Sequence, residues 1–201
     1  MKKLRKKRFS SFTLEEALML IGTNQLKKWP LDIPAKSPSK LFLLLRGKLE
    51  SHFDLSLSEA AKSMLIDVTL LEAIDPFETI KIWKEAGLQT DKTISVVDYL
   101  IAPQGVIYKT PLLCVIEAKK DDFEQGLAQC LVEMEACRWY NGQNIDIFGI
   151  VTNSLVWRFY KLANNNEVYE SIPYAESLEQ ILGILQWIFT QCENHIYSTP
   201  R

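Results

Sequence analysis

The sequence predicts a mixed α/β fold, in which a β-sheet is flanked by helices and an extra helical segment lies at the amino terminus. A continuous apolar run, Leu112–Ile116, is typical of a strand buried on both faces. Two β-rich segments precede it, at Thr79–Glu85 and Thr93–Ala102, and apolar residues at helical spacing recur on either side of them. The length of 201 residues, 47% hydrophobic and 24% charged, suits one domain with a sizeable core.

The first helix is expected after Thr13, because Thr13 and Glu16 have the spacing of a capping box. Gly22 is expected to end it. Three prolines between Trp29 and Pro38 then impose an extended linker, and a second helix is expected over Leu41–Phe53. This opening third is interpreted as an appendage packed on the core.

Charge is distributed unevenly along the chain. Residues 1–48 hold 12 Lys and Arg against 3 Asp and Glu, whereas residues 49–201 hold 11 against 22. The basic end, and the cluster in residues 2–8 above all, predicts contact with a polyanion. The alternative for that cluster is a solvated tail. We expect residues 1–55 to form a basic arm and helical appendage on a core of residues 56–201, together one compact domain.

A longer helix is expected to begin at Ser56 or Ser58 and to stop before Pro76. Glu72 falls inside its apolar stripe at 100° per residue. A carboxylate on a core-facing side needs a partner, unless it reaches water from the edge of the stripe. The residues of that predicted stripe are Leu57, Ala60, Ala61, Met64, Leu65, Val68 and Leu71.

The next three segments are expected to form a meander. Thr79–Glu85 and Thr93–Ala102 lie around Gly87, which is expected to lie in the connection between them. Pro111–Lys119 follows as the third strand, and its apolar character predicts a central position.

Asp98 is the one acidic residue within the second of these strands, and Glu117 and Lys119 end the third. A symmetric hairpin would set Asp98 opposite residue 113, about 13 Å from Glu117 at strand rise. We therefore expect an asymmetric connection over Gln104–Lys109, with a bulge or an offset loop that brings the two carboxylates together.

A helix capped by Asp121 or Asp122 is expected directly after that strand. Gln125, Gln129 and Glu133 recur at intervals of four on one of its faces. Because the helix starts just past Lys119, Gln129 is a candidate to orient a phosphate or a water, and the alternative is an exposed polar stripe. The face expected to be buried consists of Phe123, Leu127, Cys130, Leu131, Met134 and Cys137.

Three strands and a closing helix are expected in the last third. Ile145–Thr152 is expected to lie parallel to the Glu117 strand, and Leu155–Leu162 to pair with it. A short strand is expected at Glu167–Ile172, followed by an amphipathic helix over Leu178–Cys192.

This arrangement of an Asp on one strand, Glu-x-Lys on the next and a Gln on the following helix resembles the PD-(D/E)XK nuclease superfamily. Residues 148–162, FGIVTNSLVWRFYKL, are similar to part of the amino-terminal nuclease domain of type I restriction motor subunits. The resemblance covers about residues 94–162. Val97 stands where the motif has Pro, and Glu133 replaces the Tyr of the usual Gln-x-x-x-Tyr, a departure that bears on substrate contacts.

The resemblance implies a restriction-endonuclease-like fold and a metal-dependent deoxyribonuclease in restriction, defence or repair. It implies Asp98 and Glu117 as ligands of Mg²⁺ or Mn²⁺, with the backbone carbonyl of Ala118 and Glu72 as further ligands. Lys119 would orient or deprotonate the attacking water and stabilise charge.

The alternative is a non-catalytic module that keeps the nuclease fold and binds nucleic acid or a partner protein. Retention of all three motif residues favours the enzyme. DNA is the expected partner, any helicase or specificity subunits would be separate chains, and an oligomer is compatible with the sequence.

Composition also bears on metal type and compartment. Cysteines 114, 130, 137 and 192 and histidines 52 and 195 lack the spacing of a zinc site, so buried, reduced thiols are expected. No apolar run reaches the length of a membrane span, and the basic start lacks the apolar region of a signal peptide. We therefore expect a cytoplasmic protein.

Overall fold

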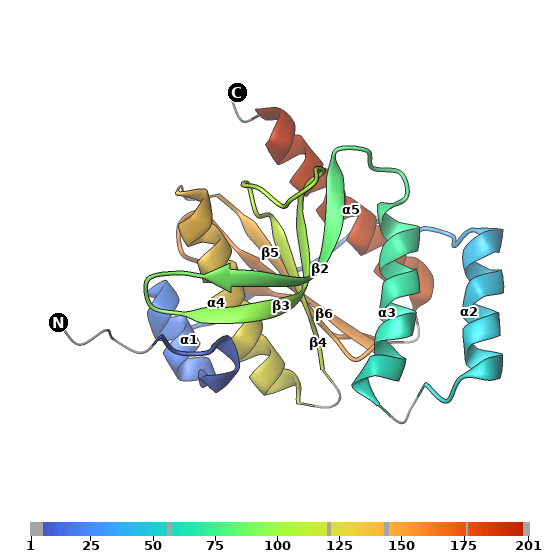
Figure 1. Ribbon diagram of the computed structural model, residues 1–201, viewed down its shortest axis with the longest axis horizontal. Helices are drawn as coiled ribbons and strands as arrows, with labels where there is room; N and C mark the ends of the chain where they lie inside the picture. The colour runs from blue at the N-terminus through green and yellow to red at the C-terminus, as the bar shows by residue number, and fades with distance from the viewer. Residues whose placement is uncertain (1–5, 56–57, 120–121, 143–144, 176, 199–201) are drawn as a thin grey trace.

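The computed structural model describes residues 6–55, 58–119, 122–142, 145–175 and 177–198, and in this part of the chain eight strands form one mixed sheet with helices on both faces (Figure 1). The strands are β1 (Leu26–Lys28), β2 (Ile80–Gln89), β3 (Ile94–Pro103), β4 (Cys114–Ala118), β5 (Ile147–Thr152), β6 (Val156–Leu162), β7 (Val168–Glu170) and β8 (Tyr174–Ala175). Their order is β1-β7-β6-β5-β4-β3-β2, and β8 pairs with β6. The predicted mixed α/β class is confirmed.

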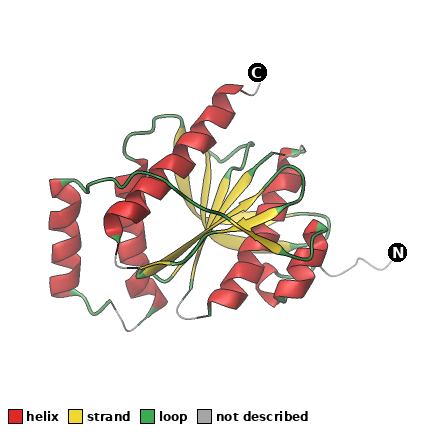
Figure 2. Ribbon diagram, turned by 180° about the vertical axis from the view of Figure 1, so that it is seen from behind, coloured by secondary structure: helices red, strands yellow, loops and turns green. Residues whose placement is uncertain are grey.

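The helices are η1 (Phe9–Ser11), α1 (Leu14–Ile21), α2 (Lys40–His52), α3 (Glu59–Ile74), α4 (Phe123–Asn141) and α5 (Leu178–Ser198). Figure 2 shows the strands fanning out between the helices. The predictions made for Lys2, Lys3, Arg5, Ser56, Leu57 and Asp121 lie outside the described residues. Ser58 and Asp122 cap α3 and α4 through their side chains.

The apolar strand β4 lies inside the sheet, as predicted, between β3 and β5. It pairs antiparallel with β3 and parallel with β5, and α4 makes the crossover between the parallel strands. Its first four residues are buried, because helices cover both faces of the sheet here. The parallel placement of β5 and its antiparallel pairing with β6 are confirmed.

The β2–β3 hairpin is longer than predicted, and the expected connection at Gly87 is wrong. Gly87 lies within β2, paired with Val96. The turn is built by Thr90, whose hydroxyl accepts hydrogen bonds from the amides of Lys92 and Thr93 at 3.2 and 3.0 Å. The hydroxyl of Thr90 therefore stabilises the turn that the sequence analysis had assigned to Gly87. The hairpin extends sideways over α1 and α4 (Figure 1).

The amino-terminal segment packs into the core. The capping box of Thr13 and Glu16 is confirmed, and Gly22 ends α1 with a left-handed φ of 86°. Together α1 and η1 lie against α4, and β1 extends the sheet by pairing parallel with β7. No strand was predicted in this segment, so β1 was missed. The core residues of this segment include Phe9, Phe12, Ala17 and Ile21.

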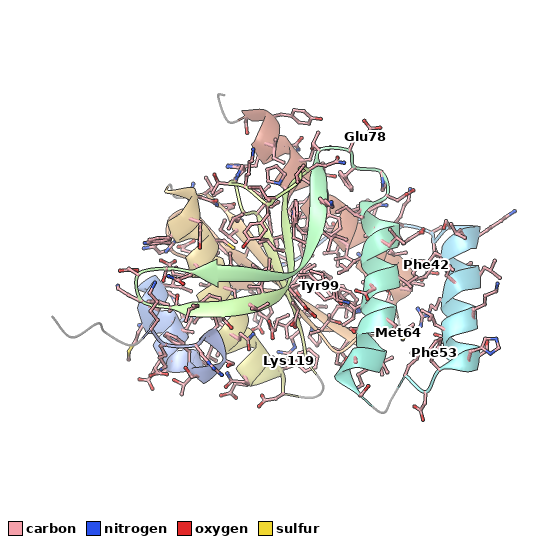
Figure 3. The ribbon with its side chains drawn as sticks, viewed as in Figure 1. Phe42, Phe53, Met64, Glu78, Tyr99 and Lys119 are labelled. Carbon is pink, nitrogen blue, oxygen red and sulfur yellow. The ribbon has the colours of Figure 1, made fainter. Side chains whose placement is uncertain are left out.

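The predicted stripe of α3 is wrong. Its fully buried side chains are Ile66, Leu70 and Ala73, whereas Leu71 is 56% exposed. The helix packs against β4 and α5 on one side and against α2 on the other, so it is apolar on two faces and periodicity alone did not separate them. Phe42 is the buried residue of α2 and lies between α2 and α3 (Figure 3).

The closing helix α5 runs to Ser198, six residues beyond its predicted end, and the residues on its core side include Ile181, Leu182, Leu185 and Ile188. The four cysteines are buried and free, as expected. Among the described residues, no helix is long and apolar enough to cross a membrane.

Candidate active site

The pairing of β3 with β4 brings two of the predicted carboxylates together. Tyr99 pairs with Ile116 and Leu100 with Val115, so continuing the register by one step sets Asp98 opposite Glu117. Opposed residues of an antiparallel pair share a face. The side chain of Asp98 also accepts a 2.8 Å hydrogen bond from the amide of Ala118. The expected offset between the strands is therefore confirmed.

The offset is accommodated outside the strand ladder. The side-chain amide of Asn141 donates to the carbonyl of Leu112 at 2.9 Å, and its oxygen accepts from the amide of Leu112 at 2.8 Å. These bonds satisfy the backbone just before β4, where no strand partner does. The segment 104–112 can then form the loop between the two strands, and pairing with β3 resumes at Leu113, whose amide donates to the carbonyl of Ile101 at 3.0 Å.

The register of β2 is interrupted beside the same position. Lys84 pairs with Tyr99 and Ala86 with Val97, but the step between them, Glu85 opposite Asp98, is not paired. Glu85 has a positive φ of 54°, which is uncommon for a residue other than glycine. The irregular backbone at Glu85 lies next to the candidate site, and no sequence pattern indicated it.

Glu117 is the buried member of the carboxylate pair. Its side chain is 1% exposed, and its Oε1 lies 2.6 Å from the Nζ of Lys119. Burial, and then the charge of Asp98, raise the pKa of Glu117 to about 7, although Lys119 opposes the shift. A carboxylate at this depth is costly unless a cation or a proton compensates it.

Lys119 connects the strand end to α4. Its amide donates to the carbonyl of Thr152 at 2.8 Å, and its Nζ donates to the Oε1 of Gln129 at 3.1 Å. Burial lowers the pKa of Lys119, but the neighbouring carboxylates, Glu117 first, outweigh burial and raise it. Figure 3 shows Lys119 at the end of the sheet, close to where α4 begins.

Gly126 leaves room for the stem of Lys119 against α4. A Cβ at this position would lie 2.9 Å from the Cγ of Lys119 and 2.8 Å from the Cγ1 of Val151. Both distances are shorter than a carbon–carbon contact allows. The first turns of α4 can therefore approach β4 and β5 only because residue 126 has no side chain.

The polar stripe of α4 faces inward. Gln129 is 6% exposed and Glu133 is 0% exposed, because both side chains face the end of β4, where Gln129 meets Lys119 and Glu133 meets Glu117. The Nε2 of Gln129 donates to the Oε1 of Glu133 at 3.0 Å. The alternative of an exposed polar stripe is wrong for these two residues. Their interval of four was the signal for a buried polar pair, and Glu133 is the site residue that received no role.

Glu133 and Glu117 interact with each other. Burial, and then the charge of Glu117, raise the pKa of Glu133 well above its ordinary value. In its protonated form Glu133 is a hydrogen-bond partner of Glu117. Apart from such a shared proton, the Oε2 atoms of both residues lack a donor within the described part of the chain. Buried acceptors without a donor require an explanation.

The structure does not bring Glu72 to this site. Its Oε1 and Oε2 accept from the amide and hydroxyl of Ser39 at 2.6 and 2.8 Å. Ser39 is the residue that caps α2. The inference that a carboxylate in the stripe of α3 serves the metal is wrong because that face of α3 meets α2. Glu72 joins two helices instead.

Asp98 and Glu117 remain as oxygen donors for a divalent metal at this site. Among the described residues, no group of three or more His, Cys, Asp or Glu side chains is arranged to hold a metal ion by itself. The site does offer hard oxygen donors from Asp98 and Glu117, and a buried Oε2 of Glu117 that lacks a donor. Mg²⁺ is usually held by one or two carboxylates, with waters and substrate phosphate completing its sphere. The donor set therefore fits Mg²⁺ or Mn²⁺.

The end of the basic arm is folded against the β2–β3 hairpin. The amide of Lys7 donates to the carbonyl of Lys92 at 3.0 Å, and its carbonyl accepts from the amide of Ile94 at 3.1 Å. The Nζ of Lys6 donates to the carbonyl of Thr90, and Lys7 forms a 2.6 Å ion pair with Glu16. For residues 6 and 7, the alternative of a solvated tail is wrong.

Comparison with known proteins finds distant, partial similarities for this mixed α/β protein, in which Asp98, Glu117 and Lys119 meet at the end of β4. No family model matches the chain. It is similar to Crinkler effector protein 5 of Phytophthora infestans, with 35% identity over 77 residues, or 34% of this chain. It is also similar to Crinkler effector protein 1 of Rhizophagus irregularis, with 27% identity over 101 residues, or 39% of this chain. The matches span 22% of the length of each relative.

Proposed function

We propose that this protein is a metal-dependent deoxyribonuclease of the PD-(D/E)XK type. The observation that carries the proposal is the juxtaposition of Asp98, Glu117 and Lys119 at the end of the central strand, with Glu117 buried and 2.6 Å from Lys119. An ion pair at this depth is costly and contributes little to stability. Strongly perturbed carboxyls at such a position favour a functional role over a structural one.

The proposed ligands are Asp98 and Glu117, with the backbone carbonyl of Ala118 beside them. The amide of Ala118 already binds Asp98, so this segment holds the carboxylate in place. A bound Mg²⁺ or Mn²⁺ would supply an activated water and neutralise charge on the phosphate. The protein supplies the fixed positions of the oxygen donors.

Lys119 is proposed to stabilise charge and orient the attacking water. Its raised pKa keeps the ammonium protonated at neutral pH, which favours these roles over proton abstraction. Gln129 holds the Nζ from one side and is itself held by Glu133. Two hydrogen bonds in sequence therefore limit the positions that the ammonium can take.

The alternative, a non-catalytic module that keeps this fold, is favoured by one observation. The Lys119–Glu117 pair and the Gln129–Glu133 bond form a network that compensates the charge of Glu117 without a metal. The names of the two relatives specify no reaction. A cytoplasmic location and separate protein subunits stay part of the proposal on sequence grounds.

Cleavage of DNA by variants of the three motif residues tests the proposal. Linear duplex and single-stranded DNA are incubated with wild type, Asp98→Asn, Glu117→Gln and Lys119→Ala, with Mg²⁺, Mn²⁺ or EDTA. We expect metal-dependent cleavage by wild type and a loss of at least a hundredfold in each variant. Lys48→Ala, an exposed lysine on α2, is the matched control and should cut like wild type.

Two outcomes would contradict the proposal. Wild-type protein that is folded but cuts neither substrate with either metal would belong to the binding-module class. Equal cleavage by wild type and Lys119→Ala would refute the role of the lysine. Residual cutting by all three variants alike would identify a contaminating nuclease.

A further inference from the structure

An open groove of about 650 Å³ lies between η1 and the β2–β3 hairpin. Polar and apolar side chains line it together. Arg8 and Ser10 contribute from η1 and the residue before it, and the hairpin contributes consecutive residues from both of its strands. Those used below are Ile94, Ser95, Val96 and Gln89.

The groove adjoins the candidate active site from two directions. Along β3, Val96 precedes Asp98 by two residues, about 7 Å at strand rise. Along α4, the carbonyl of Ser10 accepts a 3.0 Å hydrogen bond from Gln125, which lies one helical turn before Gln129. The groove therefore lies beside β3, which carries Asp98, and its η1 wall is bonded to α4, which carries Gln129.

The groove has one cationic group that is not engaged within the described part of the chain. Arg8 is exposed and its guanidinium has no carboxylate partner there, whereas Lys6 and Lys7 are held by the hairpin and by Glu16. A guanidinium is suited to phosphate because its planar fork can donate two parallel hydrogen bonds. Ser10 and Ser95 add hydroxyls beside it.

Exposed aliphatic side chains accompany this cation. Val96 is 53% exposed and Ile94 is 41% exposed, on the hairpin surface where Gly87 and Gln89 are their partners. Apolar surface beside a phosphate-binding group suits a nucleotide whose base is accessible. In a duplex the base faces are stacked on one another, so these side chains would meet only the charged backbone.

We propose that this groove seats an unpaired DNA strand next to the bond that is cut, with a phosphate on Arg8 and bases against Ile94 and Val96. The inference rests on the proposed nuclease function, and it specifies the substrate as a single-stranded end or flap. The hairpin and η1 form the two walls, and the contacts of Lys6 and Lys7 with Lys92, Ile94 and Thr90 keep those walls together.

Binding of labelled oligonucleotides tests the groove separately from cleavage. Fluorescence anisotropy in EDTA compares the full chain on a 12-nucleotide single strand and on the same sequence as a blunt duplex. We expect tighter binding of the single strand. Arg8→Gln should weaken it about tenfold and reduce the salt slope by about 0.7, the value for one phosphate on a single strand. Val96→Ser should weaken it about threefold, and the control Lys109→Gln, which changes an exposed lysine outside the basic end of the chain, should not change it.

The outcomes separate the groove from the catalytic proposal. Unchanged affinity in Arg8→Gln and Val96→Ser, with circular dichroism spectra like wild type, would overturn the groove even if the protein cuts DNA. Duplex binding as tight as single-strand binding would overturn it as well. A third outcome is a protein that cuts no DNA with Mg²⁺ but binds single strands, with weaker binding in Arg8→Gln and Val96→Ser. That outcome would support the groove as a binding site and refute the nuclease function.

Discussion

Two buried carboxyl groups, those of Glu117 and Glu133, dominate the electrostatics of the site at the scale of single residues. Burial raises the pKa of Glu117 from 4.5 to about 7, and raises that of Glu133 well above its ordinary value. A carboxyl with a raised pKa binds more protons in the folded chain than in the unfolded chain between the two pKa values. Because stability falls with pH wherever the folded state binds more protons, the metal-free fold should lose stability between pH 4.5 and about 7.

Replacing Glu133 by Gln should reduce that loss of stability. Glutamine imitates the protonated carboxyl and can still accept from Gln129. In EDTA, denaturant unfolding at pH 5 and pH 8 should show that wild type loses more stability over this pH range than Glu133→Gln does. Glu124→Gln, an exposed position on the same helix, is the control and should follow wild type. If the free energy of unfolding changed with pH equally in wild type and Glu133→Gln, Glu133 would not be a source of the pH dependence.

At the scale of elements, the strand–helix unit of β4 and α4 could be predicted and its surroundings could not. A continuous apolar run, an aspartate cap and helical spacing are local signals, and they specified β4, α4 and the parallel β5. The turn of the hairpin depends on the hydroxyl of Thr90 rather than on Gly87, so composition misplaced it. The face of α3 depends on α2, which no periodicity within α3 encodes, and Glu72 was misassigned for that reason.

The difference between local signals and long-range packing also explains which residues of the site could be predicted. Asp98, Glu117 and Lys119 stand in adjacent elements at motif spacing, so they were found, whereas the inward orientation of Glu133 depends on how α4 packs against β4 and β5, which no periodicity within α4 encodes. Whether a polar stripe on a helix is buried depends on the helices and strands that pack over it.

Adding a methyl group at Gly126 tests the fit between α4 and the strand ends. Gly126→Ala should displace the stem of Lys119 and Val151, and should lower cleavage at least tenfold through the misplaced ammonium. Gly47→Ala on α2, where a Cβ meets no atom within 4 Å, is the matched control and should be neutral or stabilising by up to about 1 kcal/mol. Full activity of Gly126→Ala would show that the site tolerates a shift of this size.

At the scale of the whole molecule, the amino-terminal segment completes the site rather than standing apart from it. It adds β1 to the sheet, covers α4 through α1 and η1, and joins the hairpin at Lys7. Removal of residues 2–8 would therefore also remove the contacts of Lys6 and Lys7 with the hairpin. Polyanion contact by this segment stays a prediction, now centred on Arg8.

Two truncations of the amino terminus test whether the backbone hydrogen bonds of Lys7 hold the β2–β3 hairpin in place. Removal of residues 2–8 should expose the amide of Ile94, whose partner is the carbonyl of Lys7, and so speed its hydrogen exchange at least tenfold. Removal of residues 2–5 keeps that bond and should leave the exchange of Ile94 unchanged. Equal exchange in both truncated proteins would show that Lys7 does not hold the hairpin.

Titration with Mn²⁺ tests the central claim, that Asp98 and Glu117 form an oxygen-ligand site for a divalent metal, most directly. Isothermal titration calorimetry at pH 8 should show binding by wild type and by Lys119→Ala, which keeps both carboxylates. Glu117→Gln should lose at least tenfold in affinity, because a charged oxygen ligand is gone while the side-chain volume is kept. Glu124→Gln should bind like wild type. A folded wild-type protein that binds no Mn²⁺, or a Glu117→Gln variant that binds as tightly as wild type, would contradict the account.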